Sequence, residues 1–283
     1  MFDRISRSLE LVRASLGILM QDKKLLAFPL LSGLVTILVV ATFILPFLLA
    51  GFSGGIVTGT PVSILLVFLF YLASYAVVIF FNVGLITCVN ARLQGKESSV
   101  GEGVANAFRH LSSILAWAAV AATVGLILRT IEDRAGFFGQ IAVAIVGGAW
   151  SLVTFFVVPV LVFEEKGVVD AVKESFSLFK KTWGETVVGS VSIGLVFVVA
   201  GLIGLAGVFA TLFLGNATVF IAALALFILL VVLLAITASA LQGIFVVVLY
   251  TYARTGVVPS GFRKDLLEQV FVPGSPQQGA GNI

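Results

Sequence analysis

Charged residues are scarce in this 283-residue chain. Asp, Glu, Lys and Arg make up 11% of it, whereas ordinary soluble domains contain about 25%. Hydrophobic residues make up 60%, and the mean hydropathy is +1.17. No water-soluble core of this size could bury so much apolar surface, so lipid must replace water around much of the chain. The composition therefore predicts an all-α, polytopic membrane protein.

Residues that usually carry chemistry are also scarce. Cys88 and His110 are the only cysteine and histidine, which excludes an intrachain disulfide and the usual zinc and haem sites. The sequence contains no phosphate-binding loop, dinucleotide fingerprint or nucleophile elbow. With a net charge of only +3, it also offers no nucleic-acid footprint. We therefore expect no enzyme activity, no catalytic residue, no cofactor, no metal and no nucleic-acid partner.

Stretches without charged residues define the expected spans. A helix needs about 20 residues to cross the bilayer core. Breaks at glycine-rich and charged segments divide the apolar runs into six expected spans, near residues 26–49, 62–89, 110–128, 136–163, 187–214 and 219–250. These spans contain no Asp, Glu, Lys or Arg, which argues against an ion-coupled transporter or a proton pump.

Basic residues indicate the orientation of these spans. Six crossings place fifteen of the seventeen Lys and Arg residues on one side and leave Arg129 and Arg134 on the other. The positive-inside rule then places both termini in the cytoplasm, with the chain in the plasma membrane. We predict a single transmembrane domain over residues 1–269, followed by a disordered tail over 270–283 that is rich in Gly, Pro and Gln.

Two short similarities indicate an internal repeat. The segments 103–109 and 167–173 share the pattern Gly-Val-x-(Asn/Asp)-Ala-x-(Lys/Arg), and 8–17 matches 175–184 at Ser, Leu and Gly. The simplest architecture has three parallel units over 1–91, 92–165 and 166–254. Each unit would contain an amphipathic elbow helix followed by a transmembrane hairpin. Chance similarity between short amphipathic helices is the alternative.

The charged segment after the fourth span supplies the candidate interface residues. Its apolar side chains fall within one arc of a helix, and its charged side chains lie outside that arc. The helix could be an elbow that sets the entry angle of the next span, or a surface for lipid headgroups or a partner protein. The candidate residues for such a surface are Glu164, Lys173, Lys180, Lys181 and Trp183.

Two amide side chains lie within the expected spans. Asn82 and Gln242 would be costly to expose to lipid, so each should face protein. Hydrogen bonding between helices is the simpler explanation, and a polar substrate site near the midplane is the alternative. A hydrated cavity that reaches either residue would favour transport. A dry, close-packed bundle with exposed basic elbows would favour a scaffold.

A spaced motif in the charged segment resembles a known group of membrane proteins. The motif is Pro159-x4-Glu164-x2-Gly167-x3-Ala171-x3-Ser175-x2-Leu178-x4-Trp183. It resembles a signature of bacterial and archaeal polytopic proteins, among them uncharacterised six-helix families and the membrane domain of glycerophosphodiester phosphodiesterases. The N-terminal segment from Ser8 to Leu31 looks closest to one of the uncharacterised families. The resemblance implies a six-helix membrane fold. The phosphodiesterase domain itself, with its metal-binding side chains, has no counterpart in this sequence.

Two functions remain open at this stage. The first is a non-enzymatic membrane scaffold or accessory subunit that contacts membrane lipids and another membrane or cytoplasmic protein through its elbows. The alternative is a transporter or channel for a small or lipidic solute. A membrane enzyme acting on lipid is disfavoured because no cluster of histidine and carboxylate residues is present.

Overall fold

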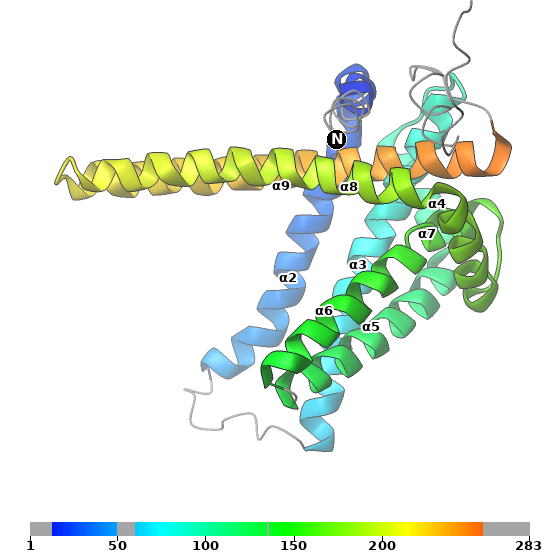
Figure 1. Ribbon diagram of the computed structural model, residues 1–283, viewed down its shortest axis with the longest axis horizontal. Coiled ribbons are helices and arrows are strands. Elements are labelled where there is room, and N and C mark those ends of the chain that lie inside the picture. Colours follow the sequence, from blue (N-terminus) through cyan, green and yellow to red (C-terminus); the bar gives the residue numbers. More distant parts are fainter. Residues whose placement is uncertain (1–12, 50–59, 135, 257–283) are drawn as a thin grey trace, which may run out of the picture.

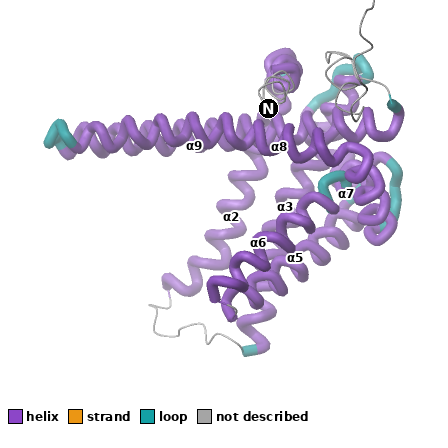
Figure 2. Tube along the Cα trace, in the orientation of Figure 1, coloured by secondary structure: helices purple, strands orange, loops and turns teal. Residues whose placement is uncertain are grey.

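The computed structural model describes residues 13–49, 60–134 and 136–256, and these ranges form helices joined by short connections (Figures 1 and 2). Within these ranges, the side chains of 46–49, 133–134, 137–138 and 183–192 are not described. A helical segment over 13–21 leads into η1 (Lys23–Leu26). The remaining helices are α2 (Ala27–Leu49), α3 (Pro61–Leu93), α4 (Val100–Arg109), α5 (Leu111–Arg134), α6 (Gly136–Val153), α7 (Val157–Phe163), α8 (Val168–Leu212) and α9 (Ala217–Thr255). The predicted all-α class is confirmed.

Six segments of the described chain are long and apolar enough to cross a membrane. They are Lys23–Leu45, Pro61–Leu93, Leu111–Glu132, Gly139–Phe163, Ile193–Leu212 and Ala217–Thr255. The six expected spans are therefore confirmed as apolar helices of sufficient length. The protein is a multi-pass membrane protein. The predicted tail over 270–283 lies outside the described residues.

Local sequence signals explain where several helices begin and end. Thr60 caps the start of α3 by accepting a hydrogen bond from the Ser63 backbone N–H at 3.2 Å. Ser99 and Glu102 form a reciprocal capping box at the start of α4. Gly256 ends α9 with φ of 68°, a left-handed conformation that glycine adopts without steric cost.

The six long helices do not all run in one direction (Figure 1). Helices α3, α5 and α6 run together, α2 leans away from them, and the α8–α9 hairpin lies across the end at which α2 begins. The sequence predicted this hairpin but not its direction. The direction follows from α9, a continuous helix whose residues 240–250 are mostly buried against α2, α3 and α7, so its other half must project outward.

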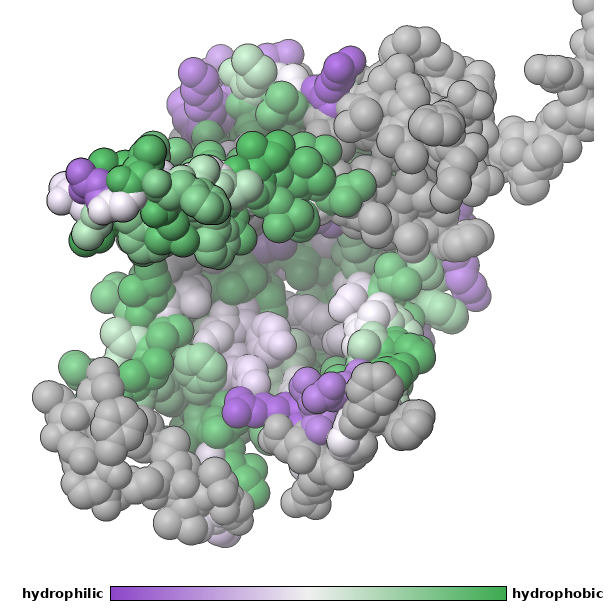
Figure 3. All heavy atoms as spheres, turned by 60° about the vertical axis from the view of Figure 1, so that its left-hand side comes forward, coloured by the Kyte–Doolittle hydropathy of each residue, from purple (hydrophilic) through white to green (hydrophobic). Residues whose placement is uncertain are grey.

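The protein core lies near the end at which α2 begins. Its fully buried side chains come mainly from α3, α7 and α9, and they include Ile86, Val89, Phe156, Val160, Ile244 and Val248, all at 0% exposure. The projecting half of the hairpin is mostly exposed and apolar, and Figure 3 shows it as an almost continuous hydrophobic surface. A helix that is apolar all round requires lipid or protein around it, not water.

A close contact between glycines joins α2, α3 and α4. A Cβ atom on Gly103 would lie 2.8 Å from the backbone oxygen of Gly84 and 2.6 Å from the ring of Phe28. The Phe28 ring is 1% exposed and fills the space that the two glycines leave open. Hydrogen bonding supports the same contact, because the Asn106 amide donates to the Thr87 hydroxyl at 2.8 Å.

The proposed repeat is not established by this geometry. Ala107 of α4 and Ala171 of α8 occupy matching positions of the shared pattern, and both are fully buried. The matching glycines differ, however. Gly103 lies inside α4 in a crowded contact. Gly167 precedes α8, and a Cβ atom added to it would have no atom within 4 Å.

We predict that Gly103→Ala lowers the thermal unfolding midpoint in detergent, because the new methyl group meets backbone that cannot move away. A cost of about 1–3 kcal/mol is typical of overpacking. Gly101→Ala is the matched control, since only Ser99 Oγ lies near its would-be Cβ, at 3.8 Å. Alanine there should leave the midpoint unchanged or raise it through better helix propensity. Equal behaviour of the two variants would contradict this account of the contact.

Candidate functional site

A break in the fourth span is bridged by one serine. Three turn residues, 154–156, separate α6 from α7, and Pro159 has no N–H to donate to the carbonyl of Phe155. The Ser175 hydroxyl of α8 donates to the Val153 carbonyl at 2.6 Å and accepts from the Phe156 N–H at 3.0 Å. Ser175 is fully buried, so one side chain satisfies two backbone groups that would otherwise lack partners in an apolar environment.

We predict that Ser175→Ala destabilises the folded protein by about 2–4 kcal/mol, since each buried backbone group left without a partner costs about 1–3 kcal/mol. Thermal unfolding of the purified protein in detergent would measure the loss. Ser177→Ala is the matched control, because Ser177 lies on the same helix and its hydroxyl makes no contact with the break. A Ser175→Ala protein as stable as this control would show that the bridge contributes nothing.

Four charged side chains and one tyrosine close the corner between α7 and α8. Glu164 lies 2.8 Å from Lys166 Nζ and 3.0 Å from Arg254 Nη2, and it accepts a hydrogen bond from Tyr250 Oη at 2.8 Å. Glu174 lies 3.0 Å from Lys166 and 3.2 Å from Arg254. We call these five residues the corner network. Its two positive and two negative charges balance, and it joins the start of α8 to the end of α9.

The corner network favours the charged forms of Glu164 and Lys166. Burial alone would raise the pKa of Glu164, but hydrogen bonds from Lys166 and Tyr250 and the charge of Arg254 outweigh burial and lower it. Hydrogen bonds to Glu164 and Glu174 raise the pKa of Lys166. The contribution of Glu164 to stability is therefore complete above its unfolded pKa and is lost as the pH falls through the lower folded value. Glu164 and Lys166 are therefore both charged at neutral pH.

The predicted interface residues occupy two different environments. Glu164 is held inside the corner network, with a side chain only 9% exposed. Lys173, Lys180 and Lys181 are exposed on the first part of α8. Lys180 Nζ lies 4.7 Å from the centre of the Phe176 ring. The side chain of Trp183 lies outside the described residues.

One face of this part of α8 is covered by protein. Ala171, Ser175, Leu178 and Thr182 are fully buried, whereas Val169 and Phe176 are exposed. Thr182 has non-helical dihedral angles, with φ of −121° and ψ of 18°, so the axis of α8 bends there before the long apolar part begins. The segment therefore packs on protein and redirects the chain, as an elbow does.

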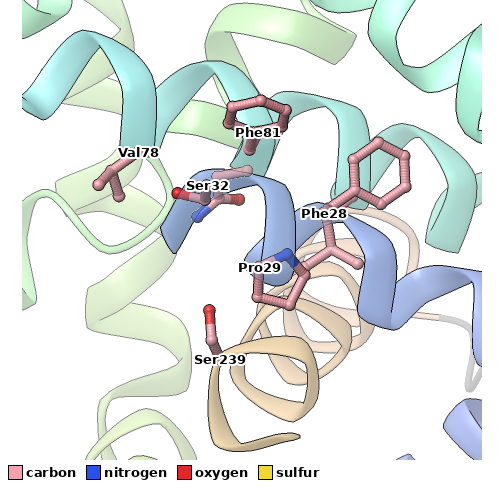
Figure 4. A pocket seen from close by; sticks show the side chains of 8 residues that line it. Phe28, Pro29, Ser32, Val78, Phe81 and Ser239 are labelled. Carbon is pink, nitrogen blue, oxygen red and sulfur yellow. The ribbon is translucent and has the colours of Figure 1, made fainter. Parts of the chain in front are cut away.

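A small pocket lies where α2, α3 and α9 meet (Figure 4). Its volume is about 50 Å³. The lining residues are Phe28, Pro29 and Ser32 of α2, Val78, Phe81, Asn82 and Leu85 of α3, and Ser239 of α9. The predicted polar residue Asn82 thus faces a cavity. Gln242 does not line it; this residue is half-buried and is already engaged in an interaction.

Within the described part of the chain, no group of three or more His, Cys, Asp or Glu side chains is arranged to hold a metal ion. Cys88 is buried, and its Sγ lies 3.5 Å from the Ser99 carbonyl oxygen. His110 lies at the end of α4, where Nδ1 contacts the Asn106 carbonyl at 2.9 Å. Both side chains have a local structural explanation.

Comparison with known proteins identifies one family. A family model described as a family of unknown function (DUF6159) matches residues 61–262. The chain belongs to this family. No curated protein and no solved structure matches the chain. In this DUF6159 protein the matched region begins at α3 and extends beyond α9, so it includes the break, the corner network and most of the pocket.

Sequence reasoning identified part of these two sites. Glu164 was a candidate interface residue, and Asn82 was expected to face protein, most simply through hydrogen bonds between helices. The structure instead gives Asn82 a cavity and no hydrogen bond within the described residues. The motif contained Ser175 without indicating its role. Tyr250 and Arg254 gave no local signal, because they follow Glu164 by 86 and 90 residues. Ser32 also gave no local signal of a site, because a serine in an apolar helix commonly hydrogen-bonds to its own helix backbone.

Proposed function

We propose that this DUF6159 protein is a non-enzymatic membrane scaffold or accessory subunit whose elbow at the start of α8 lies against anionic headgroups of the cytoplasmic leaflet. The observation that carries the proposal is the exposed face of that elbow. Val169, Lys173, Phe176 and Lys180 recur every three to four residues, so they form one stripe along the helix, with Lys181 beside it. Mixed basic and apolar side chains of this kind suit the boundary between headgroups and acyl chains.

The corner network supports this proposal through its charge balance. Glu164 and Glu174 are engaged with Lys166 and Arg254, so their negative charges are neutralised within the corner. Glu165, just before α8, is exposed, and Asp170 lies beside the stripe, where its 3.4 Å contact with Lys173 joins two highly exposed groups. Exposed pairs of this type contribute little, so the surface stays basic.

Orientation in the plasma membrane is part of the proposal. Lys23, Arg92, Lys166 and Arg254 all lie near the helix ends where the exposed elbow is found, whereas Arg129 lies toward the other end of α5. The positive-inside rule would place the elbow end and both termini in the cytoplasm.

The orientation predicts opposite labelling of two engineered cysteines. In a Cys88→Ser background, Lys96→Cys should react with a membrane-impermeant maleimide only after the cells are opened. Glu132→Cys should react in intact cells, because it lies at the far end of α5. Labelling of both positions from the same side would contradict the six-span orientation.

The elbow surface predicts selective retention of anionic lipid. Wild-type protein extracted in native-lipid nanodiscs should be enriched in anionic lipids, and in Lys173→Gln/Lys180→Gln/Lys181→Gln the affinity behind that enrichment should fall about a hundredfold. This estimate follows from about 1 kcal/mol per basic residue near an anionic surface. Mass spectrometry of the co-extracted molecules is the measurement.

The matched control for the lipid experiment replaces the same lysines by arginine, which keeps the charge and should keep the enrichment. The same spectra also test the scaffold role. A stoichiometric soluble substrate, recovered without lipid or protein, would overturn the proposal. A transporter is the second candidate function, favoured by the cavity that reaches Asn82, and that outcome would support it.

A further inference from the structure

The pocket between α2, α3 and α9 contains polar groups that the protein itself does not satisfy. Ser32, Asn82 and Ser239 each come from a different helix and line the same cavity (Figure 4). None of the three side chains hydrogen-bonds another residue of the described chain. Asn82 and Ser239 are also exposed. A primary amide without partners is costly in a bilayer, so these groups require a ligand or water.

The chemistry of the lining excludes a charged ligand group. None of the eight lining residues is ionisable at neutral pH, and five of them are Phe, Pro, Val or Leu. A phosphate or an ammonium group placed there would lose its hydration without gaining an opposite charge. The three polar side chains instead offer neutral donors and acceptors, which match hydroxyl and ester groups.

The depth of the pocket also indicates an uncharged ligand group. Ser32 follows Lys24 by eight residues, and Asn82 precedes Arg92 by ten. At 1.5 Å per residue, these helical distances are about 12–15 Å. Basic side chains at the ends of spans lie near the phosphates, so the pocket lies below the phosphate level. Uncharged parts of a lipid are found at that depth.

The surroundings of the pocket connect it to lipid. Val78, which lines it, is 47% exposed, and Leu34 of the neighbouring α2 is 53% exposed. The α9 helix before Ser239 is also apolar and largely exposed, and Figure 3 shows the hairpin surface as hydrophobic. A volume of about 50 Å³ is large enough for a small polar group or a few waters but not for a whole lipid. The rest of a lipid ligand would lie outside, along these apolar helices.

We propose that this pocket binds the uncharged polar end of a neutral glyceride, with Asn82 as its main hydrogen-bonding residue. The amide of Asn82 donates to an ester carbonyl and accepts from a free hydroxyl, and the hydroxyls of Ser32 and Ser239 complete the site. The acyl chains extend into the surrounding lipid. This site is separate from the basic elbow and does not depend on the elbow's contact with anionic headgroups.

The test uses the full-length protein and a photoactivatable dioleoylglycerol probe in nanodiscs. The probe should crosslink to peptides of α2, α3 or α9 around the pocket, and unlabelled dioleoylglycerol should compete. Dioleoylphosphatidylglycerol and free glycerol should not compete at equal concentration. The first carries a charge, and the second lacks the apolar part that brings the ligand into the membrane.

Variants of the pocket provide the second readout. Asn82→Leu keeps a similar side-chain volume and should weaken dioleoylglycerol binding about tenfold, as expected from two lost hydrogen bonds. Asn90→Leu is the matched control on the same helix outside the pocket and should bind as wild type does. Val78→Phe should also weaken binding by filling the cavity, while Asn82 is retained.

Several results would overturn the proposal. Crosslinks confined to other helices would place the ligand elsewhere. Equal affinity of Asn82→Leu and Asn90→Leu would remove Asn82 from the site. Equal competition by the phospholipid would show a general lipid contact, and competition by glycerol would show a site for a soluble polyol. If crosslinking does not saturate, the pocket holds only water.

Discussion

A break in a membrane helix leaves backbone groups that lipid cannot satisfy, and this constraint shapes the arrangement around α7. Pro159 removes one donor, the turn at 154–156 interrupts the helix, and Ser175 of α8 supplies the missing hydrogen bonds. Because Ser175 can do so only when α8 packs on the break, the break fixes the position of the elbow.

The corner network extends this constraint to the end of the chain. Once the elbow is in place, Glu164 and Glu174 lie within reach of Arg254, and Tyr250 completes the network. The last turns of α9 are held there, while its preceding residues pack against α2, α3 and α7. The sideways direction of the α8–α9 hairpin follows, since α9 is one continuous helix. Lys173 and Lys180 remain on the outer face of the elbow.

The two polar sites of the protein differ in what they leave unsatisfied. In the corner network every charged group has an opposite charge within 4 Å, so the network needs nothing from outside. The pocket has the reverse property, because Asn82 and its two neighbouring serines face a cavity without protein partners. The corner network is therefore complete within the protein, whereas the polar groups of the pocket still need a ligand or water.

The sequence by itself determined the class, the six apolar helices and most of their limits, because apolar runs and charged breaks act over neighbouring residues. It also identified Asn82 and Glu164 as polar positions worth attention. Only the tertiary structure decided that Ser175 bridges a helix break, that Arg254 pairs with Glu164, and that Ser32 and Ser239 join Asn82. These contacts link residues from 19 to 90 positions apart or on three separate helices, and their geometry depends on how the helices pack. The direction of the last hairpin was undetermined for the same reason, since hydropathy gives the length of a helix and packing gives its direction.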